Sequence, residues 1–223
     1  MNLANLPSDV NSLITSYLSR NDALTFTRVS RIIRDSILAN LIREHRAFMK
    51  GDGIDGSTRL MRAASERSVD WDKIRFIVNT LGRQAVVVQD EFGVTAIHNA
   101  VRAGSLEVIR LLCEKGGKEA VLLRNSLGDS ALHAAVSMED MDVVKLLCEV
   151  GGKELVMLRN NMGLTAMYNA AEMGNIEIVY HLCVVGGKDA VSLRNNDGDT
   201  PLTIANDRFH ADIVVLLTSV QET

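Results

Sequence analysis

Apolar residues along positions 57–223 form short blocks separated by polar turns, and the blocks return at a fixed interval. In SLEVIRLLCEK (105–115), the apolar positions mostly keep the spacing of an amphipathic helix, as Leu106, Ile109, Leu111 and Leu112 show. Similar segments are DMDVVKLLCEV (140–150), NIEIVYHLCVV (175–185) and ADIVVLLTSV (211–220). Each follows a shorter, Ala-rich segment: TAIHNAVRAG (95–104), SALHAAVSME (130–139), TAMYNAAEMG (165–174) or TPLTIANDRF (200–209). The pattern predicts repeated units of two helices and an all-α fold.

A glycine and a hydroxyl residue mark the start of each unit. The glycines lie 35 residues apart, at Gly93, Gly128, Gly163 and Gly198. The hydroxyl residues follow two positions later, at Thr95, Ser130, Thr165 and Thr200. Glycine permits the positive φ of a tight turn, and a Ser or Thr side chain can cap the helix that follows. Within that helix, small residues at Ala100, Ala135, Ala170 and Ala205 allow close approach to neighbouring helices.

The units are joined by a stretch that is almost the same each time. It is GGKEAVLLRN at 116–125, GGKELVMLRN at 151–160 and GGKDAVSLRN at 186–195, with a fainter copy, LGRQAVVVQD, at 81–90. Constant spacing with tolerated substitution is typical of a unit that stacks on copies of itself. We interpret the stretch as a junction, in which Gly-Gly ends the second helix and the next residues pack beneath it.

These units resemble the ankyrin repeat. The family pattern of Gly-x-Thr-Pro-Leu-His followed by alanines is visible in GVTAIHNA, GDSALHAA, GLTAMYNA and GDTPLTIA, although the unit here has 35 residues and the typical unit 33. A more degenerate copy begins at STRLMRAASERSVDWDKIRFIV. The resemblance implies a solenoid of five repeats, at 57–89, 90–124, 125–159, 160–194 and 195–223. We expect one elongated domain that is a monomer on its own.

Residues 1–50 have no copy in the repeats, and their apolar pattern predicts three helices before a glycine-rich break, GDGIDG, at 51–56. The segment resembles an F-box, with a Leu-Pro start, an Ile-x-x-Tyr-Leu helix end and a Val-Ser-Arg before the third helix. That resemblance implies binding to the Skp-type adaptor subunit of a cullin ubiquitin ligase, through Leu6, Pro7, Val10, Ile14, Leu18, Val29 and Ile33. Ile33 stands where the family often has Trp. The alternative is a three-helix cap that covers the first repeat.

Composition narrows the possible functions. The net charge of −4 disfavours nucleic-acid binding, and no apolar run is long enough to span a membrane. MNLANLPSDV lacks the basic and apolar regions of a signal peptide, so we expect a cytoplasmic protein, or a nuclear one. If a virus or bacterium encodes the protein, we expect it in the host cytoplasm. The cysteines, Cys113, Cys148 and Cys183, are too far apart in stacked repeats to form disulfides, so we expect buried thiols.

No arrangement of residues predicts catalysis, a metal or a cofactor. His98 and His133 occupy the same repeat position, where a hydrogen bond to the preceding turn is a simpler role than metal binding. Two basic columns recur, Lys118, Lys153 and Lys188, and Arg124, Arg159 and Arg194. They could bind phosphates, or they could form a solvated edge with the acidic residue that follows each lysine.

The positions that vary between copies are candidates for binding a target protein. Ankyrin proteins bind through their turn tips and the inner face of the first helices, which implies a stripe of Phe92, Leu127 and Met162 with Val94 and Leu164 beside it. Alternatively, these side chains tuck against neighbouring turns. Candidates on the inner helical face are Arg102, Met138 and Met173, with Ser137, Glu172, Asp207 and Arg208.

The sequence therefore favours a protein-interaction adaptor that is not an enzyme. The leading hypothesis is a substrate receptor of a Skp–cullin–F-box ubiquitin ligase, whose ankyrin array binds an unknown protein target. The alternative is a plain ankyrin scaffold whose N-terminal helices only cap the array.

Overall fold

The helices come in pairs, as the hydrophobic pattern predicts. The structure, a computed structural model, describes residues 59–65 and 71–222, which belong to the unit Ser57–Thr223. Within these ranges all regular secondary structure is helical, and the only extended pairings are the isolated bridges Arg124–Ser130 and Arg159–Thr165. The predicted adaptor-binding residues, Leu6 to Ile33, and the 51–56 break lie outside the described residues.

Four complete pairs follow one another along the chain. They are α6 (Ala96–Ala103) with α7 (Leu106–Val121), α8 (Ala131–Ser137) with α9 (Met141–Val156), α10 (Ala166–Met173) with α11 (Ile176–Val191), and α12 (Pro201–Asp207) with α13 (Ala211–Glu222). Before them come α3 (Arg59–Ser65), α4 (Trp71–Leu81) and the short α5 (Arg83–Val86).

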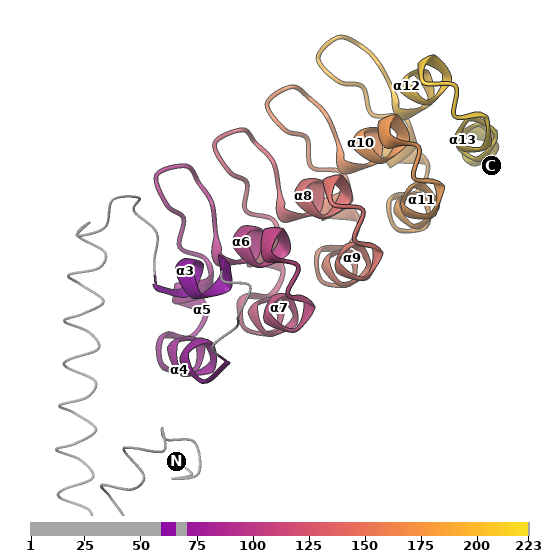
Figure 1. Ribbon diagram of the computed structural model, residues 1–223. Helices are drawn as coiled ribbons and strands as arrows, with labels where there is room; N and C mark the ends of the chain where they lie inside the picture. The colour runs from indigo at the N-terminus through magenta and orange to yellow at the C-terminus, as the bar shows by residue number, and fades with distance from the viewer. Residues whose placement is uncertain (1–58, 66–70, 223) are drawn as a thin grey trace, which may run out of the picture. The chain divides into compact units, whose positions relative to one another are not determined.

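The pairs stack so that like helices lie side by side (Figure 1). We call α3, α6, α8, α10 and α12 the inner row, and α4, α7, α9, α11 and α13 the outer row. The loops that lead into α6, α8, α10 and α12 project to the same side of the array (Figure 1). We call these loops fingers and define them as residues 89–94, 124–129, 159–164 and 194–199.

The core lies between the two rows and between successive pairs. The alanines predicted to allow close approach, Ala100, Ala135, Ala170 and Ala205, are fully buried. Leucines and isoleucines of the outer row, such as Ile109, Leu147 and Leu182, are fully buried as well. Small residues in one row and branched residues in the other thus fill the space between helices, which is the packing that the sequence pattern predicts.

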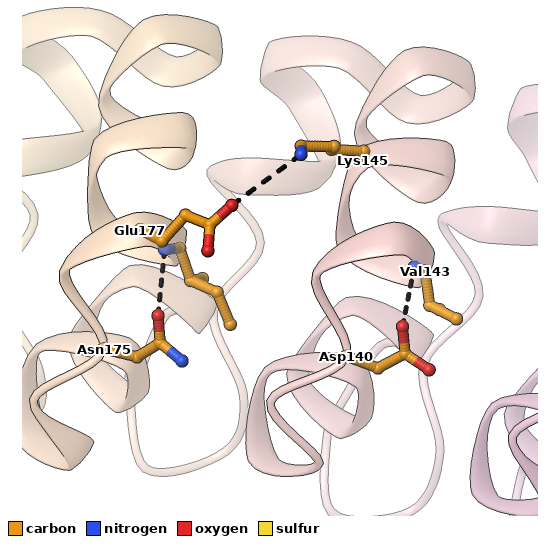
Figure 2. Close-up of polar contacts among 6 residues, drawn as sticks. Asp140, Val143, Lys145, Asn175 and Glu177 are labelled. Carbon is orange, nitrogen blue, oxygen red and sulfur yellow. Dashed lines mark hydrogen bonds and ion pairs between the residues drawn. The ribbon is translucent and has the colours of Figure 1, made fainter.

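Side chains at the helix starts fix where the outer helices begin. The Asp140 carboxylate accepts a hydrogen bond from the Val143 N–H at 3.1 Å, and the Asn175 side chain does the same for Ile178 in the next pair at 3.1 Å (Figure 2). These bonds satisfy backbone donors that the first turn of a helix leaves free. Lys145 of one outer helix lies 3.8 Å from Glu177 of the next, and both side chains are exposed (Figure 2).

The Gly-Gly pair interrupts each outer helix, but the chain turns helical again directly afterwards. In α9, Gly152 has φ 62° and ψ −156°, and the helix resumes at Lys153 and ends at Val156. Gly-Gly therefore ends the long first part of the outer helix, as expected, but one more helical turn follows it. The segment that follows is a separate helical turn whose Leu155 and Val156 are fully buried. In the first unit the equivalent turn is α5, entered through Gly82 with φ 62° and ψ −150°.

The two glycines of the pair are required for different reasons. A Cβ on Gly151 would lie 2.5 Å from the Leu155 Cβ, so a side chain there would collide with the buried turn. A Cβ on Gly152 would meet no atom within 4 Å, but its positive φ with ψ near 180° is a conformation that essentially only glycine adopts. One glycine allows the turn to pack, and the other allows the chain to enter it.

We therefore expect Gly152→Ala to lower the free energy of unfolding by about 1–3 kcal/mol, because alanine would be held in a strained conformation. Urea unfolding measures this change. Glu149→Ala, at an exposed position of the same helix, is the control and should change stability by less than about 0.5 kcal/mol. Equal stability of the two variants would contradict the assigned role of Gly152.

Candidate functional site

Each finger is shaped by one side chain at the end of the repeated stretch. The Asn125 Oδ1 accepts hydrogen bonds from the N–H groups of Leu127 and Asp129, both at 2.9 Å. The same two bonds recur one repeat apart at Asp90, Asn160 and Asn195. The final residue of GGKEAVLLRN is therefore a turn residue that satisfies backbone donors at the finger tip.

Neighbouring fingers are joined through their backbones. The Ser126 N–H donates to the Phe92 carbonyl at 2.7 Å, and the Asn161 N–H donates to the Leu127 carbonyl at 3.0 Å. The next bond in the series, from Asn196 to the Met162 carbonyl, is 3.1 Å long. A Cβ on Gly128 would lie 2.6 Å from the Asn161 nitrogen, so the close approach of the fingers also requires glycine. The result is a ladder that fixes one finger against the next.

The arginine column stabilises the same ladder. Arg124 Nη1 donates to the Arg159 carbonyl at 3.0 Å, Arg159 Nε donates to the Gly163 carbonyl at 3.1 Å, and Arg194 Nη1 donates to the Gly198 carbonyl at 2.6 Å. All three arginines are exposed, and each donates a hydrogen bond to a finger carbonyl, a role that neither sequence-based alternative includes.

The lysine column forms the charge-mixed edge that the sequence predicts. Lys118 lies 2.7 Å from Glu154 and Lys153 lies 2.5 Å from Asp189, each acid belonging to the next repeat. The Lys153 ammonium, through its hydrogen bond and its charge, lowers the pKa of the Asp189 carboxyl. All four side chains are exposed, so each pair contributes little to stability.

The histidines His98 and His133 link α6 and α8 to the fingers that follow them. The His98 Nδ1 lies 2.8 Å from the Thr95 Oγ1, and its Nε2–H donates to the Asp129 carbonyl at 3.2 Å. His133 repeats the arrangement with Ser130 at 2.9 Å and the Leu164 carbonyl at 3.1 Å. The predicted bond to the preceding turn is present, and a bond to the following repeat adds to it. Burial, as the largest effect, lowers the pKa of both imidazoles.

A cavity of about 130 Å³ lies between the fingers and the inner row. It is lined from the finger side by Val94, Asn125 and Asp129, and from helices α6, α8 and α10 by Arg102, Ser137 and Asn169, among others. We call this surface, together with the finger tips, the groove. The cavity thus brings Val94, a candidate beside the tip stripe, close to Arg102 and Ser137, candidates on the inner helical face.

The finger-tip stripe is exposed. The exposed fractions of Phe92, Leu127 and Met162 are 57%, 65% and 62%, so these side chains do not tuck against neighbouring turns. Val94 and Leu164, beside them, are half-buried. Met138 and Met173 are also exposed, but they lie at the opposite end of the inner helices, one helix length of about 10 Å from the fingers. Met138 and Met173 therefore lie apart from the finger-tip stripe, although Ser137, which precedes Met138, lines the cavity.

Some exposed apolar residues were missed by the sequence analysis. Phe209 is 91% exposed and has φ 62°, at a turn position where two other repeats have glycine. Tyr180, Val184 and Val215 are exposed on α11 and α13 of the outer row. Comparing the copies position by position could have found them, since earlier repeats have charged residues at the positions of Tyr180 and Val184.

The three cysteines lie in the packed interior of the array. Cys113, Cys148 and Cys183 are free and buried. Burial raises the pKa of the first two to about 12 and that of Cys183 to about 11, which disfavours the reactive thiolate. Within residues 59–65 and 71–222, no three His, Cys, Asp or Glu side chains gather as metal ligands. No helix in these ranges is long and apolar enough to cross a membrane.

Comparison with known families agrees with this geometry. The family model for ankyrin repeats (3 copies) matches residues 32–122, 60–157 and 115–192. These matches together cover most of the chain, which therefore belongs to the ankyrin-repeat family and is a protein-interaction scaffold. The first match begins at residue 32, inside the segment that resembles an F-box, and no F-box match accompanies it. No curated protein matches the sequence.

The histidine bonds predict how stability depends on pH. Protonation would put a hydrogen on Nδ1, which faces the N–H and hydroxyl of Thr95 or Ser130, so the folded state favours the neutral ring. Because the folded pKa lies below the unfolded value of about 6.5, the stabilisation is present above about pH 6.5 and is lost as the pH falls through the folded pKa.

We expect the melting temperature to fall as the pH is lowered from about 7.5 to about 5.5, and to fall less in a variant with His98→Gln and His133→Gln. Calorimetry at several pH values measures both slopes. Single variants should give intermediate slopes. A double variant with the slope of the unmodified chain would show that these histidines do not sense pH.

Proposed function

We propose that the protein is a substrate receptor of a Skp–cullin–F-box ubiquitin ligase. The ankyrin array binds a target protein in the groove, the N-terminal segment binds the Skp-type adaptor, and the chain itself performs no chemistry. The proposal that the array binds a target rests mainly on the stripe of exposed apolar side chains at the finger tips. The fingers that present this stripe are hydrogen-bonded to one another through their backbones.

The geometry of the fingers favours recognition of a protein segment. Phe92, Leu127 and Met162 follow one another at one residue per repeat, and packed helices lie about 10 Å apart. Their carbonyls already accept hydrogen bonds from the next finger, so a partner meets side chains on a fixed backbone. Large apolar anchors of this kind provide most of the free energy in many interfaces, and fixing them before binding lowers the entropic cost.

The adaptor-binding half rests on the order and spacing of residues in the N-terminal segment. The Leu6–Pro7 start, the helix pattern of Val10, Ile14 and Leu18, and the later Val29 and Ile33 follow the F-box arrangement. Ile33 keeps the apolar character of the position that often holds Trp, but it buries less area. We therefore expect weaker adaptor binding than a Trp at this position would give. A cullin ligase role places the protein in the cytoplasm or the nucleus, as a monomer before the ligase assembles.

The second candidate is a plain ankyrin scaffold whose N-terminal helices cap the array. The start of the family match at residue 32 favours it, because ankyrin-like sequence then extends into the F-box-like segment. The two candidates share the groove as the target-binding site and differ only in whether the N-terminal segment binds an adaptor.

Binding of the full-length chain to a purified Skp-type adaptor separates the candidates. We expect the unmodified chain to bind, and the variant with Leu6→Ala and Pro7→Ala to lose binding while its melting temperature stays unchanged. Phe92→Ala is the matched control, because it changes the groove and should leave adaptor binding intact. Failure of the unmodified chain to bind the adaptor would leave the scaffold with a cap as the function.

A further inference from the structure

The cavity between the fingers and the inner row is lined mostly by residues with polar side chains. Asp129 lines it from the finger side, and Arg102 and Asn169 line it from α6 and α10. A volume of about 130 Å³ is enough for several water molecules, so one side chain of a partner can enter the cavity. The polar groups of the lining then decide which kind of side chain it accepts.

Arg102 brings a positive charge that is not neutralised within the array. Its side chain is exposed and makes no hydrogen bond or ion pair with any residue that the structure describes. The equivalent positions of the next two repeats hold Ser137 and Glu172. Ser137 donates to a backbone carbonyl of its own helix at 3.0 Å, and Glu172 lies 2.5 Å from Arg208. These two side chains are bonded within the array, whereas Arg102 keeps its donors free for a ligand.

Asp129 brings the opposite charge from the finger side. One of its carboxylate oxygens accepts a hydrogen bond from the Asn160 side chain at 2.9 Å, and the other accepts none from a described residue. No ion pair links Asp129 to Arg102, although both residues line the cavity. One wall of the cavity therefore offers an acceptor that lacks a donor, and the other wall offers donors that lack an acceptor.

Asn169 adds an amide to the helix side of the cavity. This half-buried side chain makes no hydrogen bond within residues 59–65 and 71–222. The equivalent Asn99 is bonded, since its side chain donates to the Met61 carbonyl of the preceding inner helix at 3.2 Å. A polar group that is partly withdrawn from water costs free energy when it has no partner, and a ligand that bonds to it recovers part of that cost.

The two charges together select against a charged ligand. A carboxylate would be attracted to Arg102 but repelled by Asp129, and an ammonium group would meet the reverse. A carboxamide carries a carbonyl acceptor and an NH₂ donor on one flat group, so it can accept from Arg102 and donate to Asp129 at the same time. An apolar side chain would leave all of these groups without a partner.

We propose that the cavity binds a glutamine or asparagine side chain of the target protein, through Arg102 and Asp129 on its two walls. The inference rests on the proposed function, because it specifies one residue of the segment that the groove binds. That segment presents apolar side chains to the finger-tip stripe and one carboxamide to the cavity, where Asn169 provides a further hydrogen bond.

Peptide-display selection with the full-length chain tests the proposal, because it requires no known target. Random peptides are selected for binding to the immobilised chain and then sequenced. We expect the selected peptides to be enriched in large apolar residues and in Gln or Asn. The tightest of them is then synthesised with its own carboxamide residue and with Glu, Lys or Met in that place, and fluorescence anisotropy measures the four affinities.

We expect the carboxamide peptide to bind about three- to tenfold more tightly than the Glu, Lys and Met peptides. Removing one charge should change this preference in a defined direction. Asp129→Asn should favour the Glu peptide, because Arg102 is then unopposed, and Arg102→Gln should favour the Lys peptide, because Asp129 is then unopposed. Glu149→Gln, which removes an exposed charge from the outer row, is the matched control and should leave the preference unchanged.

Both cavity variants should fold, because the repeats already accept other residues at these positions. The position of Asp129 holds Val94 and Leu164 in neighbouring fingers, and Arg102 is exposed. Asparagine in place of Asp129 also keeps an oxygen that can accept from the Asn160 side chain. Melting temperatures equal to that of the unmodified chain check this.

The outcomes separate this inference from the function on which it rests. If the selected peptides lack Gln and Asn, if another peptide binds as tightly as the carboxamide peptide, or if neither charge removal changes the preference, the carboxamide site is wrong. The apolar groove then still stands, provided that Phe92→Ala and Met162→Ala weaken binding of the selected peptides. If the selection enriches no peptide at all, both the carboxamide site and the groove as a target-binding site are contradicted.

Discussion

Each repeat of this protein leaves backbone groups that only the next repeat satisfies. The carbonyls of Phe92, Leu127 and Met162 each accept a hydrogen bond of 2.7–3.1 Å from an N–H group of the following finger. An unpaired amide or carbonyl in a packed structure costs free energy comparable to a lost hydrogen bond. The period of 35 residues follows from this constraint, because each finger must arrive in register with the one before it.

The other recurring residues serve the same register. Asn125 and its equivalents shape the fingers, the arginines bind finger carbonyls, and His98 and His133 connect α6 and α8 to the fingers that follow. The Gly-Gly pair returns the chain from the outer helix to the finger through one buried helical turn. The asparagine, arginine and Gly-Gly positions are identical in the three stretches that begin at 116, 151 and 186, whereas the histidine position becomes Tyr168 and Thr203 in later units. The tip side chains take no part in the ladder and can differ, which leaves them available for recognition.

Much of the array could be predicted from the sequence because its signals are local. The helix pairs, the caps at Thr95 and Thr165, and the buried alanines all depend on residues a few positions apart. The role of Arg124 could not be predicted, because its acceptor, the Arg159 carbonyl, lies 35 residues away and carries no sequence signal. For the same reason the second bond of each histidine, from His98 to the Asp129 carbonyl and from His133 to the Leu164 carbonyl, could not be predicted. The tip stripe was predicted as a list of residues, but its exposure depends on packing that the pattern does not determine.

Hydrogen exchange at the finger amides tests the central claim most directly, namely that the repeats hold the fingers in a fixed register. The N–H groups of Ser126, Asn161 and Asn196 bond only to the preceding finger. If the ladder is part of the cooperative fold, they should exchange as slowly as the amides in the middle of α8 and α10, with similar free energies of opening. Exchange as fast as in a free surface loop would show that the fingers move independently, and the account of a fixed binding surface would then be wrong.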